Sequence, residues 1–453
     1  MRKLLSSRPV KVSLIGIPLI AVPVFLNLIL YAGMGGARTT SPMTPLFMKA
    51  VFGASVGLVS VYNLYFVVMA IAGLCKQVGY PAAAPRTRFA VIIAARNEAA
   101  VIQKLIESLK GQNYPSGLFD IYVAPNNCTD NTEQIALQSG ALIYSPTGMI
   151  RSKGDVLHQI VAAITKEGRH DAICIFDADN LVHPGFLQKM NDARASGAKV
   201  AQGLRDSKNP ADTPVSACYS ICYWILSRLY NGGRAAAGLS GVINGTGFMV
   251  DTALLEALGG WNTQSITEDC EFSAQCVLAG ERIHYVMDAI IYDEQPLTFR
   301  QSWKQRRRWH TGIVENSRAY FLSLSKQAVT RRCKLSLDMA VTFFSPVITI
   351  VSALVAGVDA LLMVYRMLFQ SLAPPLFTIL ISMLFFYALC TLTATFMVLL
   401  NRKSITHKIG RGIGYFAFFI ASWIPISIIS LFRRKKTWEV IPHTRCVDLS
   451  DMG

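Results

Sequence analysis

The sequence has few charged residues, and acidic residues are especially scarce. Only 16% of its 453 residues are Asp, Glu, Lys or Arg, whereas soluble domains carry about 25%. The 28 acidic residues are outnumbered by 44 Lys and Arg, which gives a net charge of +16. The 10 cysteines include no Cys-x-x-Cys pair and no regular spacing, which argues against a disulfide framework and against a thiolate zinc site. With 52% hydrophobic residues, the composition excludes a disordered chain and indicates an integral membrane protein with a globular domain.

The hydrophobic residues are concentrated at the two ends of the chain. Two apolar runs, 10–31 and 47–75, precede the middle region, and three more follow it at 338–368, 376–400 and 412–432. The first two exceed the ~20 residues that a helix needs to cross a bilayer. The first run has a basic start like that of a signal peptide, but its length and the shortage of small residues at its end predict a retained anchor.

The positions of Lys and Arg predict how these runs are oriented. The N-terminus is basic and the loop 33–44 contains a single Arg. We therefore expect this loop outside and the middle region in the cytoplasm, in a multi-pass protein of the plasma (inner) membrane. The loop 401–411 and the tail at 433–436 are both basic, which is inconsistent with a single crossing by 412–432. Pro425 would allow that segment to form a re-entrant or interfacial hairpin. We expect two spans before the middle region and two after it, and leave 412–432 open.

The middle region alternates apolar runs with helical patterns. The runs 89–95, 121–124, 141–144 and 172–176 are expected to be strands, and the continuous apolar run at 89–95 is typical of a strand buried on both faces. Strands that alternate with helices predict a mostly parallel sheet. In such sheets ligands bind beyond the carboxyl ends of the strands. Polar residues follow three of these four runs directly, so we expect the chemistry there.

Five short motifs occur in order along this region. They are Asn97-Glu98, the turn 127–130 (Asn-Cys-Thr-Asp), Asp177-Ala178-Asp179, Thr267-Glu268-Asp269, and Gln305-Arg306-Arg307-Arg308-Trp309. Together they resemble glycosyltransferase family 2, in its membrane-embedded processive branch of cellulose, chitin, hyaluronan and poly-N-acetylglucosamine synthases. The similarity covers roughly residues 86 to 335 and implies a cytoplasmic GT-A-like α/β domain, Rossmann-like with a mostly parallel sheet, inserted between α-helical transmembrane segments. The predicted parts are two transmembrane helices in 1–76, the glycosyltransferase domain in 77–335 with interfacial helices at about 214–231 and 299–334, and a membrane region with a basic tail in 336–453.

Asp177 and Asp179 directly follow the fourth predicted strand. Two carboxylates so spaced offer hard oxygen ligands to Mg²⁺ or Mn²⁺, which also binds phosphate oxygens. The resemblance implies that this metal holds the diphosphate of a UDP-sugar donor and stabilises charge on the leaving group. The alternative is a polar turn in which Asp179 or Asn180 caps the next helix.

Thr267, Glu268 and Asp269 precede a helical pattern. One interpretation makes Thr267 an N-cap, with the acids in a first turn that favours negative charge. The resemblance implies a catalytic role for this pair, with Asp269 as the general base that deprotonates an acceptor hydroxyl. A single displacement inverts the anomeric configuration, so an α-linked nucleotide sugar would give a β-linkage.

The stretch 300–334 is strongly basic, with Glu315 as its only acid. This pattern is typical of an interfacial helix on anionic lipid, but it does not explain why Gln305 and Trp309 are one helical turn apart. The resemblance implies that Arg308 binds the diphosphate. It assigns Gln305 and Trp309 to the acceptor, with Trp309 as a platform for the sugar at the growing end. We expect both interpretations to apply, in different parts of the segment.

The resemblance assigns further residues to the two substrates. Lys153, expected in a loop, resembles a lysine near the uracil and phosphates, and an exposed surface lysine is the alternative. Asn126 stands where many relatives have an acid that contacts uracil; an amide still bonds that ring, and Asp130 is a second candidate. The turn 245–247 is assigned to the acceptor, with a purely structural glycine turn as the alternative. The residues so assigned are Ala95, Asn97, Glu98, Asn126, Asp130 and Lys153 for the donor and Gly245, Thr246 and Gly247 for the acceptor.

Three functions fit these motifs to different degrees. The first is a processive synthase that uses a UDP-sugar to extend a β-linked oligosaccharide or polysaccharide and exports it through its own helices. The second is a non-processive transferase that glycosylates a membrane lipid such as a ceramide or diacylglycerol. The third, a scaffold without catalysis, is disfavoured by the intact motifs. Because the positive charge lies beside the membrane segments, we expect membrane lipids and no nucleic acid as partners. The sugar, its linkage and the oligomeric state are left open at this point.

Overall fold

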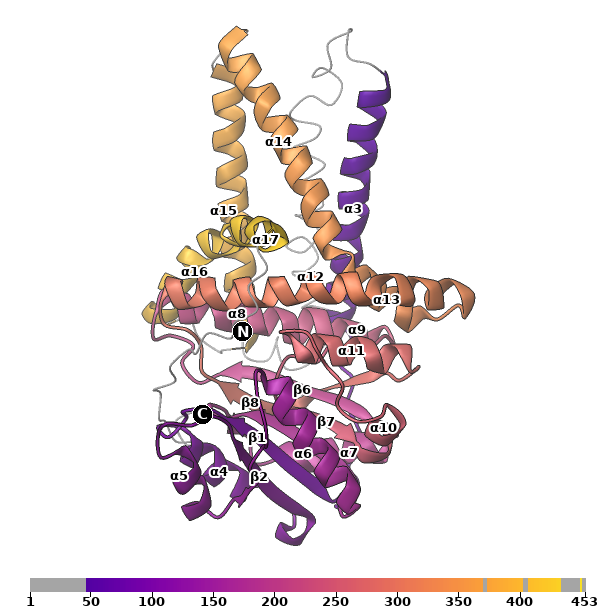
Figure 1. Ribbon diagram of the computed structural model, residues 1–453. Helices are drawn as coiled ribbons and strands as arrows, with labels where there is room; N and C mark the ends of the chain where they lie inside the picture. The colour runs from indigo at the N-terminus through magenta and orange to yellow at the C-terminus, as the bar shows by residue number, and fades with distance from the viewer. Residues whose placement is uncertain (1–45, 370–372, 402–405, 433–448, 450–453) are drawn as a thin grey trace.

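The chain folds into a helix-covered sheet from one end of which long apolar helices project (Figure 1). This computed structural model describes residues 46–369, 373–401, 406–432 and 449. The first apolar run, 10–31, and the basic tail at 433–436, whose placement is predicted above, lie outside the described residues.

One half of the sheet is parallel. β1 pairs with β2 on one side and with β4 on the other, and β3 extends β2. These strands are β1 Phe89–Ala95, β2 Phe119–Pro125, β3 Leu142–Ile143 and β4 Ala172–Asp177. Alternate side chains of β1 enter two different hydrophobic cores, Val91 and Ile93 on one face and Ala90 and Ile92 on the other. Burial on both faces explains the unbroken apolar run and confirms the prediction for this half.

The other half of the sheet is mixed, so the mostly parallel sheet that we predicted is wrong there. It contains β5 Leu181–Val182, β6 Val200–Ser207, β7 Phe248–Asp251 and β8 Ile283–Asp293, and the full order is β3-β2-β1-β4-β7-β6-β8-β5. β7 is antiparallel to both β4 and β6, and β5 is antiparallel to β8, while β6 and β8 are parallel. The reversal matters for function. Because β7 runs against β4, the loop that precedes β7 lies at the carboxyl end of β4, where Gly247 donates to the carbonyl of Ile175.

Helices cover both faces of the sheet, as an α/β domain requires. On one face the core includes residues of α6 Lys153–Glu167, α10 Thr252–Ala257 and α11 Glu268–Leu278. On the other face it includes residues of α4 Ile102–Lys110, α5 Thr132–Gln138 and α7 Phe186–Ala195.

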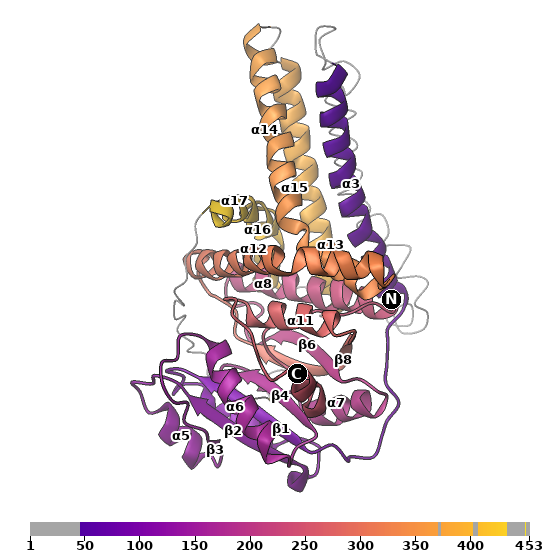
Figure 2. The ribbon, with the colours of Figure 1, turned by 45° about the vertical axis from the view of Figure 1, so that its right-hand side comes forward.

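A layer of helices separates the sheet from the long apolar helices (Figures 1 and 2). It contains α8 Pro214–Ile225, the π-helical turn η2 Leu226–Asn231, α9 Gly232–Ala236, α12 Phe299–Thr330 and α13 Lys334–Phe343. α8 and α12 both begin with a capping box, at Thr213 and Thr298, which satisfies the first backbone donors of each helix. Helices are therefore present at both positions that we predicted for interfacial helices.

Among the described residues, four segments are long and apolar enough to cross a membrane: Ala50–Cys75, Ser345–Phe369, Ile379–Asn401 and His407–Phe432. They belong to α3 Leu46–Cys75, α14 Ser345–Phe369, α15 Ala373–Asn401, and the pair α16 His407–Ala421 and α17 Trp423–Phe432. The last segment is broken at Ser422, and Figure 1 shows α16 and α17 near α12 at the foot of α14 and α15. The break lies three residues before Pro425, where a proline was expected to interrupt the helix; the re-entrant or interfacial placement of this segment stays a prediction.

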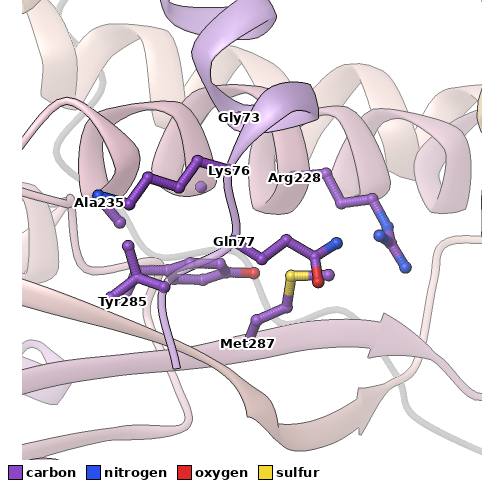
Figure 3. Close-up of a pocket in the computed structure, with 9 residues that line it drawn as sticks. Gly73, Lys76, Gln77, Arg228, Ala235, Tyr285 and Met287 are labelled. Carbon is purple, nitrogen blue, oxygen red and sulfur yellow. The ribbon is translucent and has the colours of Figure 1, made fainter. Parts of the chain in front are cut away.

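α3 is held against η2 and α9 by a close backbone contact. A Cβ atom on Gly73 would lie 2.5 Å from the carbonyl oxygen of Arg228 and 2.8 Å from the backbone nitrogen of Gly233, and a Cβ on Gly233 would overlap the carbonyl of Met69. Figure 3 shows this end of α3, with Lys76 and Arg228 extending in different directions around a small pocket that Tyr285 and Met287 also line. Glycine at both contact positions is what allows the helices to approach so closely.

A buried ion pair supports the same contact. Arg234 of α9 and Asp338 of α13 are both buried, with Nε and Oδ2 3.1 Å apart. Tyr65 of α3 donates a hydrogen bond to the same carboxylate, and the guanidinium lies 3.6 Å from the ring centroid of Tyr230. Three segments far apart in the sequence are therefore joined through a single carboxylate.

We predict that Gly73→Ala weakens the attachment of α3, because the added methyl group would meet two backbone atoms of the helix layer. Overpacking of this kind costs about 1–3 kcal/mol, so the thermal unfolding midpoint of the purified protein in detergent should fall by at least ~2 °C. Gly57→Ala is the matched control in the same helix, since within the described residues no atom outside the neighbouring helix backbone lies within 4 Å of its Cβ position. Equal midpoints for the two variants would contradict this account of the contact.

Candidate functional site

Polar groups from four separate segments meet beyond the carboxyl end of β4. At their centre is Lys153, whose Nζ lies 2.5 Å from Oδ1 of Asp177, 2.8 Å from the carbonyl oxygen of Gly245 and 3.9 Å from Oε1 of Glu268. The side chain of Ser152 caps α6 and so fixes Lys153 as the first residue of that helix. The loop and the exposed lysine considered above are therefore both wrong: Lys153 begins a helix and its side chain is only 17% exposed.

The charges at this point shift one another's titration. Burial acts to lower the pKa of Lys153, but the carboxylates of Asp177 and Glu268 outweigh it and the pKa is raised. Burial raises the pKa of Glu268 to about 7, opposed by Lys153 and reinforced by Asp269. The pKa of Asp269 is also raised by burial, against the effects of a backbone N–H, Lys153 and Arg205. Two buried carboxylates beside one ammonium are thus able to accept a proton at a higher pH than exposed ones.

Glu268 and Asp269 form the first turn of α11. Thr267 stands at the N-cap position, as one interpretation predicted, but its side chain makes no capping hydrogen bond. A Cβ on Gly245 would lie 3.6 Å from Oδ2 of Asp269, which places the loop 245–247 against the proposed base. Gly245 has a φ of 82°, a conformation that favours glycine, so the turn has a structural reason for its glycine as well.

Asp179 is buried, two residues beyond Asp177. Asn180 donates to Oδ1 of Asp179 at 3.5 Å and to Oδ1 of Asp293 at 2.9 Å. The hydroxyl of Thr246 donates to Asn180 and accepts from the backbone N–H of Asp177 at 2.9 Å. The capping alternative for Asp179 and Asn180 is wrong, because β5 follows them and α7 begins only after it.

Arg205 and Asp293 belong to this group, and sequence reasoning missed both. Nε of Arg205 donates to Oδ2 of Asp293 at 2.9 Å, its Nη2 donates to the same oxygen, and its Nη1 donates to the carbonyl of Asn244 at 2.8 Å. Each residue lies near the carboxyl end of a strand, Arg205 in β6 and Asp293 in β8. The same rule of polar residues at strand ends would have found them, had these two strands been recognised.

Trp309 of α12 is joined to this group by aromatic contacts. Its ring packs edge-on with Tyr219 and Tyr223, at centroid distances of 5.9 and 6.2 Å. The guanidinium of Arg205 lies 4.4 Å from the ring centroid of Tyr223. Both tyrosines come from α8, which lies at the position predicted for an interfacial helix. A continuous set of contacts thus runs from the strand ends to Trp309.

The basic stretch of α12 has neighbours of more than one kind. Arg308 is half-buried, and the side-chain oxygen of Gln305 is buried with no hydrogen-bond partner among the described residues. Arg306 is fully buried and donates to the carbonyl of Phe419 at 3.1 Å and to the hydroxyl of Ser422 at 2.8 Å. It therefore holds the α16–α17 hairpin against α12. The charge pattern of the sequence did not distinguish this structural arginine from Arg308.

The other donor candidates lie at the ends of β1 and β2. In the sheet register, Ala94 is opposite Asp177 and Ala95 is opposite Pro125, so the turns after both strands adjoin the carboxylates. Asn126, directly after β2, has a buried side-chain oxygen with no partner within the described part of the chain. Asn97 and Glu98 lie in the turn after β1. Asp130 accepts hydrogen bonds from the backbone N–H groups of Ala99 and Thr132 and from the hydroxyl of Thr132. Burial acts to raise the pKa of Asp130, but these hydrogen bonds outweigh it and the pKa is lowered.

Within the described residues, no group of three or more His, Cys, Asp or Glu side chains is arranged to hold a metal ion. Asp177 and Asp179 are left as a carboxylate pair. Mg²⁺ in nucleotide sites typically takes one or two carboxylates and completes its shell with water and phosphate oxygens. The donor set therefore fits a metal that binds together with a diphosphate.

Residues 85–312 match the family model described as Glycosyltransferase like family 2. Over 304 residues the chain is 27% identical to "Probable glycosyltransferase YdaM" of Bacillus subtilis (strain 168), across 62% of this chain and 71% of that protein. Over 267 residues it is 25% identical to "Beta-monoglucosyldiacylglycerol synthase" of Synechocystis sp. (strain ATCC 27184 / PCC 6803 / Kazusa), across 56% and 53% of the two chains. The match thus spans about half the length of the latter relative.

A solved structure shares the fold. The mannosyltransferase PcManGT from Pyrobaculum calidifontis, in complex with GDP-Man and Mn²⁺, aligns with a TM-score of 0.56 and 16% identity. The alignment covers 84% of this chain and 98% of that one. It therefore extends beyond the sheet domain.

Proposed function

The chain belongs to glycosyltransferase-like family 2, and we propose that it transfers a sugar from a UDP-sugar to an acceptor hydroxyl at a membrane surface, with inversion of the anomeric carbon. One observation carries the proposal. The ammonium of Lys153 lies between Asp177 and Glu268, so the motif that the resemblance assigns to the donor and the motif it assigns to the base share one charged contact.

The donor side of the site is proposed as follows. Asp177 and Asp179 would hold the divalent cation, Mg²⁺ or Mn²⁺, which neutralises the donor diphosphate as UDP leaves. The unpartnered buried amide oxygen of Asn126 suits the N–H of a uracil ring. Arg308, half-buried beside Trp309, is the proposed phosphate ligand, because a guanidinium pairs with two phosphate oxygens at once.

Asp269 is the proposed general base. It takes the proton of the acceptor hydroxyl while that oxygen bonds to the anomeric carbon and the bond from this carbon to the diphosphate breaks. UDP leaves with the electron pair, and an α-linked donor yields a β-linked product. The raised pKa of Asp269 suits a base that works near neutral pH. Glu268 also faces the ammonium of Lys153, and we propose that it keeps the local charge balanced.

The proposed acceptor is the growing end of a polysaccharide. Trp309, supported by Tyr219 and Tyr223, offers an aromatic ring against which a sugar ring stacks. The turn 245–247 lies beside Asp269. Figure 2 shows α12 between the sheet and the apolar helices. We therefore propose a multi-pass protein of the inner membrane, with its catalytic domain in the cytoplasm and its product passed processively toward its own membrane helices.

A membrane lipid is the second candidate acceptor. The Synechocystis relative is named a beta-monoglucosyldiacylglycerol synthase. The headgroup hydroxyl of a diacylglycerol lies at the membrane surface, the same depth at which α12 is proposed to present Trp309.

Asp269→Asn should abolish transfer but keep donor binding, because the amide preserves shape and cannot accept the proton. General-base catalysis contributes roughly 100- to 10,000-fold, so the rate of UDP release with acceptor present should fall by that factor. Binding of UDP, measured by calorimetry on the same preparation, should stay within twofold of the wild type. Full activity of this variant would remove Asp269 from its proposed role.

The rate should depend on pH in a defined direction. A carboxylate base must be deprotonated, and burial raises the pKa of Asp269, so kcat should fall on the acidic side at a higher pH than an exposed aspartate would give. Lys153 favours the charged forms of Asp269 and Glu268, and Lys153→Met should therefore raise their pKa and move the acidic limb of the kcat profile to higher pH. Lys104→Met, a change on the outer helix α4, is the control and should leave the limb in place. A limb near pH 4 in the wild type would show that an exposed carboxylate is responsible.

One assay separates the two acceptors. Purified protein in nanodiscs receives labelled UDP-glucose or UDP-N-acetylglucosamine, and the products are divided between an organic phase and a size-exclusion column. Long, water-soluble chains that β-specific hydrolases degrade are the expected result. Label found only in the organic phase, with one sugar per lipid, would replace the polymer by the lipid acceptor.

A further inference from the structure

α12 has two functional halves. Its first half carries Gln305 and Trp309, and its second half lies against α11, whose first turn contains the proposed base. Three residues that follow Trp309, namely Gly312, Asn316 and Tyr320, are spaced four apart and so share one face of the helix. Each of these three residues contacts α11 or the loop directly before α11.

The first two contacts are both made to Thr267, the residue before Glu268. A Cβ on Gly312 would overlap the side chain of Thr267, so the backbone of α12 lies directly on it. Nδ2 of Asn316 donates to the hydroxyl of Thr267 at 3.1 Å and to its carbonyl at 3.3 Å. Asn316 is 1% exposed. Thr267 makes no capping bond of its own; its hydroxyl is held by Asn316 of α12 and by the hydroxyl of Ser265 at 3.3 Å.

The third contact is made one turn further along. Tyr320 donates to Oε1 of Glu271 at 2.8 Å. The other oxygen of Glu271 accepts the backbone N–H groups of Gln264 and Ser265 at 2.7 and 2.6 Å. The loop before α11 and the first turns of the helix are therefore held on the same face of α12.

We propose that Asn316, together with Gly312, is a positioning residue that fixes Asp269 relative to Trp309. Both residues act through Thr267, two residues before the base, and Asn316 also bonds the side chain of Cys270, the residue after the base. Because α12 is one continuous helix of 32 residues, the acceptor platform and the support of the base are parts of a single rigid element. This inference rests on the proposed function, because it takes Asp269 as the base and Trp309 as the acceptor platform.

The test replaces Asn316 by a side chain of similar volume without donors. Asn316→Leu should lower kcat roughly 10- to 100-fold, the loss expected from a small displacement of a catalytic group. The dissociation constant for UDP should stay within twofold, because the donor site is untouched. Arg318→Leu, an exposed position in the same helix, is the matched control and should resemble the wild type. A kcat within twofold of the wild type, or an equal loss of UDP binding, would overturn the proposal.

A double-mutant cycle keeps the test valid if packing also suffers. Gly312→Ala should reduce kcat strongly in the wild-type background, since its methyl group displaces Thr267. In a Thr267→Gly background the overlapping atoms are gone, and Gly312→Ala should then change kcat by less than twofold. The same loss in both backgrounds would refute the contact as the cause. An inactive wild-type protein would instead contradict the proposed function, so the two failures are distinguishable.

Discussion

The site depends on one buried ammonium. Lys153 stands at the start of a helix, where the helix dipole disfavours a positive charge, and it is held there by Asp177, Glu268 and the carbonyl of Gly245. Without it, the carboxylates of Asp177 and Glu268 would lose the ammonium that lies between them. The interaction also joins α6, β4, α11 and the loop before β7. The geometry of the site and its charge balance are thus consequences of a single contact.

A second constraint comes from α12. Its buried Arg306 holds the α16–α17 hairpin through the carbonyl of Phe419 and the hydroxyl of Ser422, and its Gly312 lies on Thr267. The same helix therefore touches the apolar hairpin, the aromatic group around Trp309 and the segment that carries Asp269.

The sequence predicted well what depends on local patterns. The apolar run at 89–95 became a doubly buried strand, the motif residues Asp177 and Glu268 met at one edge of the sheet, and a proline marked the bent segment. It failed where tertiary pairing decides. β7 pairs antiparallel with β4 and β6, which lie far from it in the sequence, so no local pattern gives its direction. No local signal in Arg205 or Asp293 reveals that they pair. The helix start at Lys153 was missed although Ser152, a common N-cap residue, stood directly before it.

The central claim is that the two aspartates after β4, the acids of α11 and Trp309 enclose one donor and one acceptor. A structure determined with a bound UDP-sugar in lipid nanodiscs tests it most directly. The account predicts a diphosphate against Asp177 and Asp179, with the sugar between Asp269 and Trp309. A nucleotide at another edge of the sheet, or a sugar on the opposite side of α12 from Trp309, would contradict it.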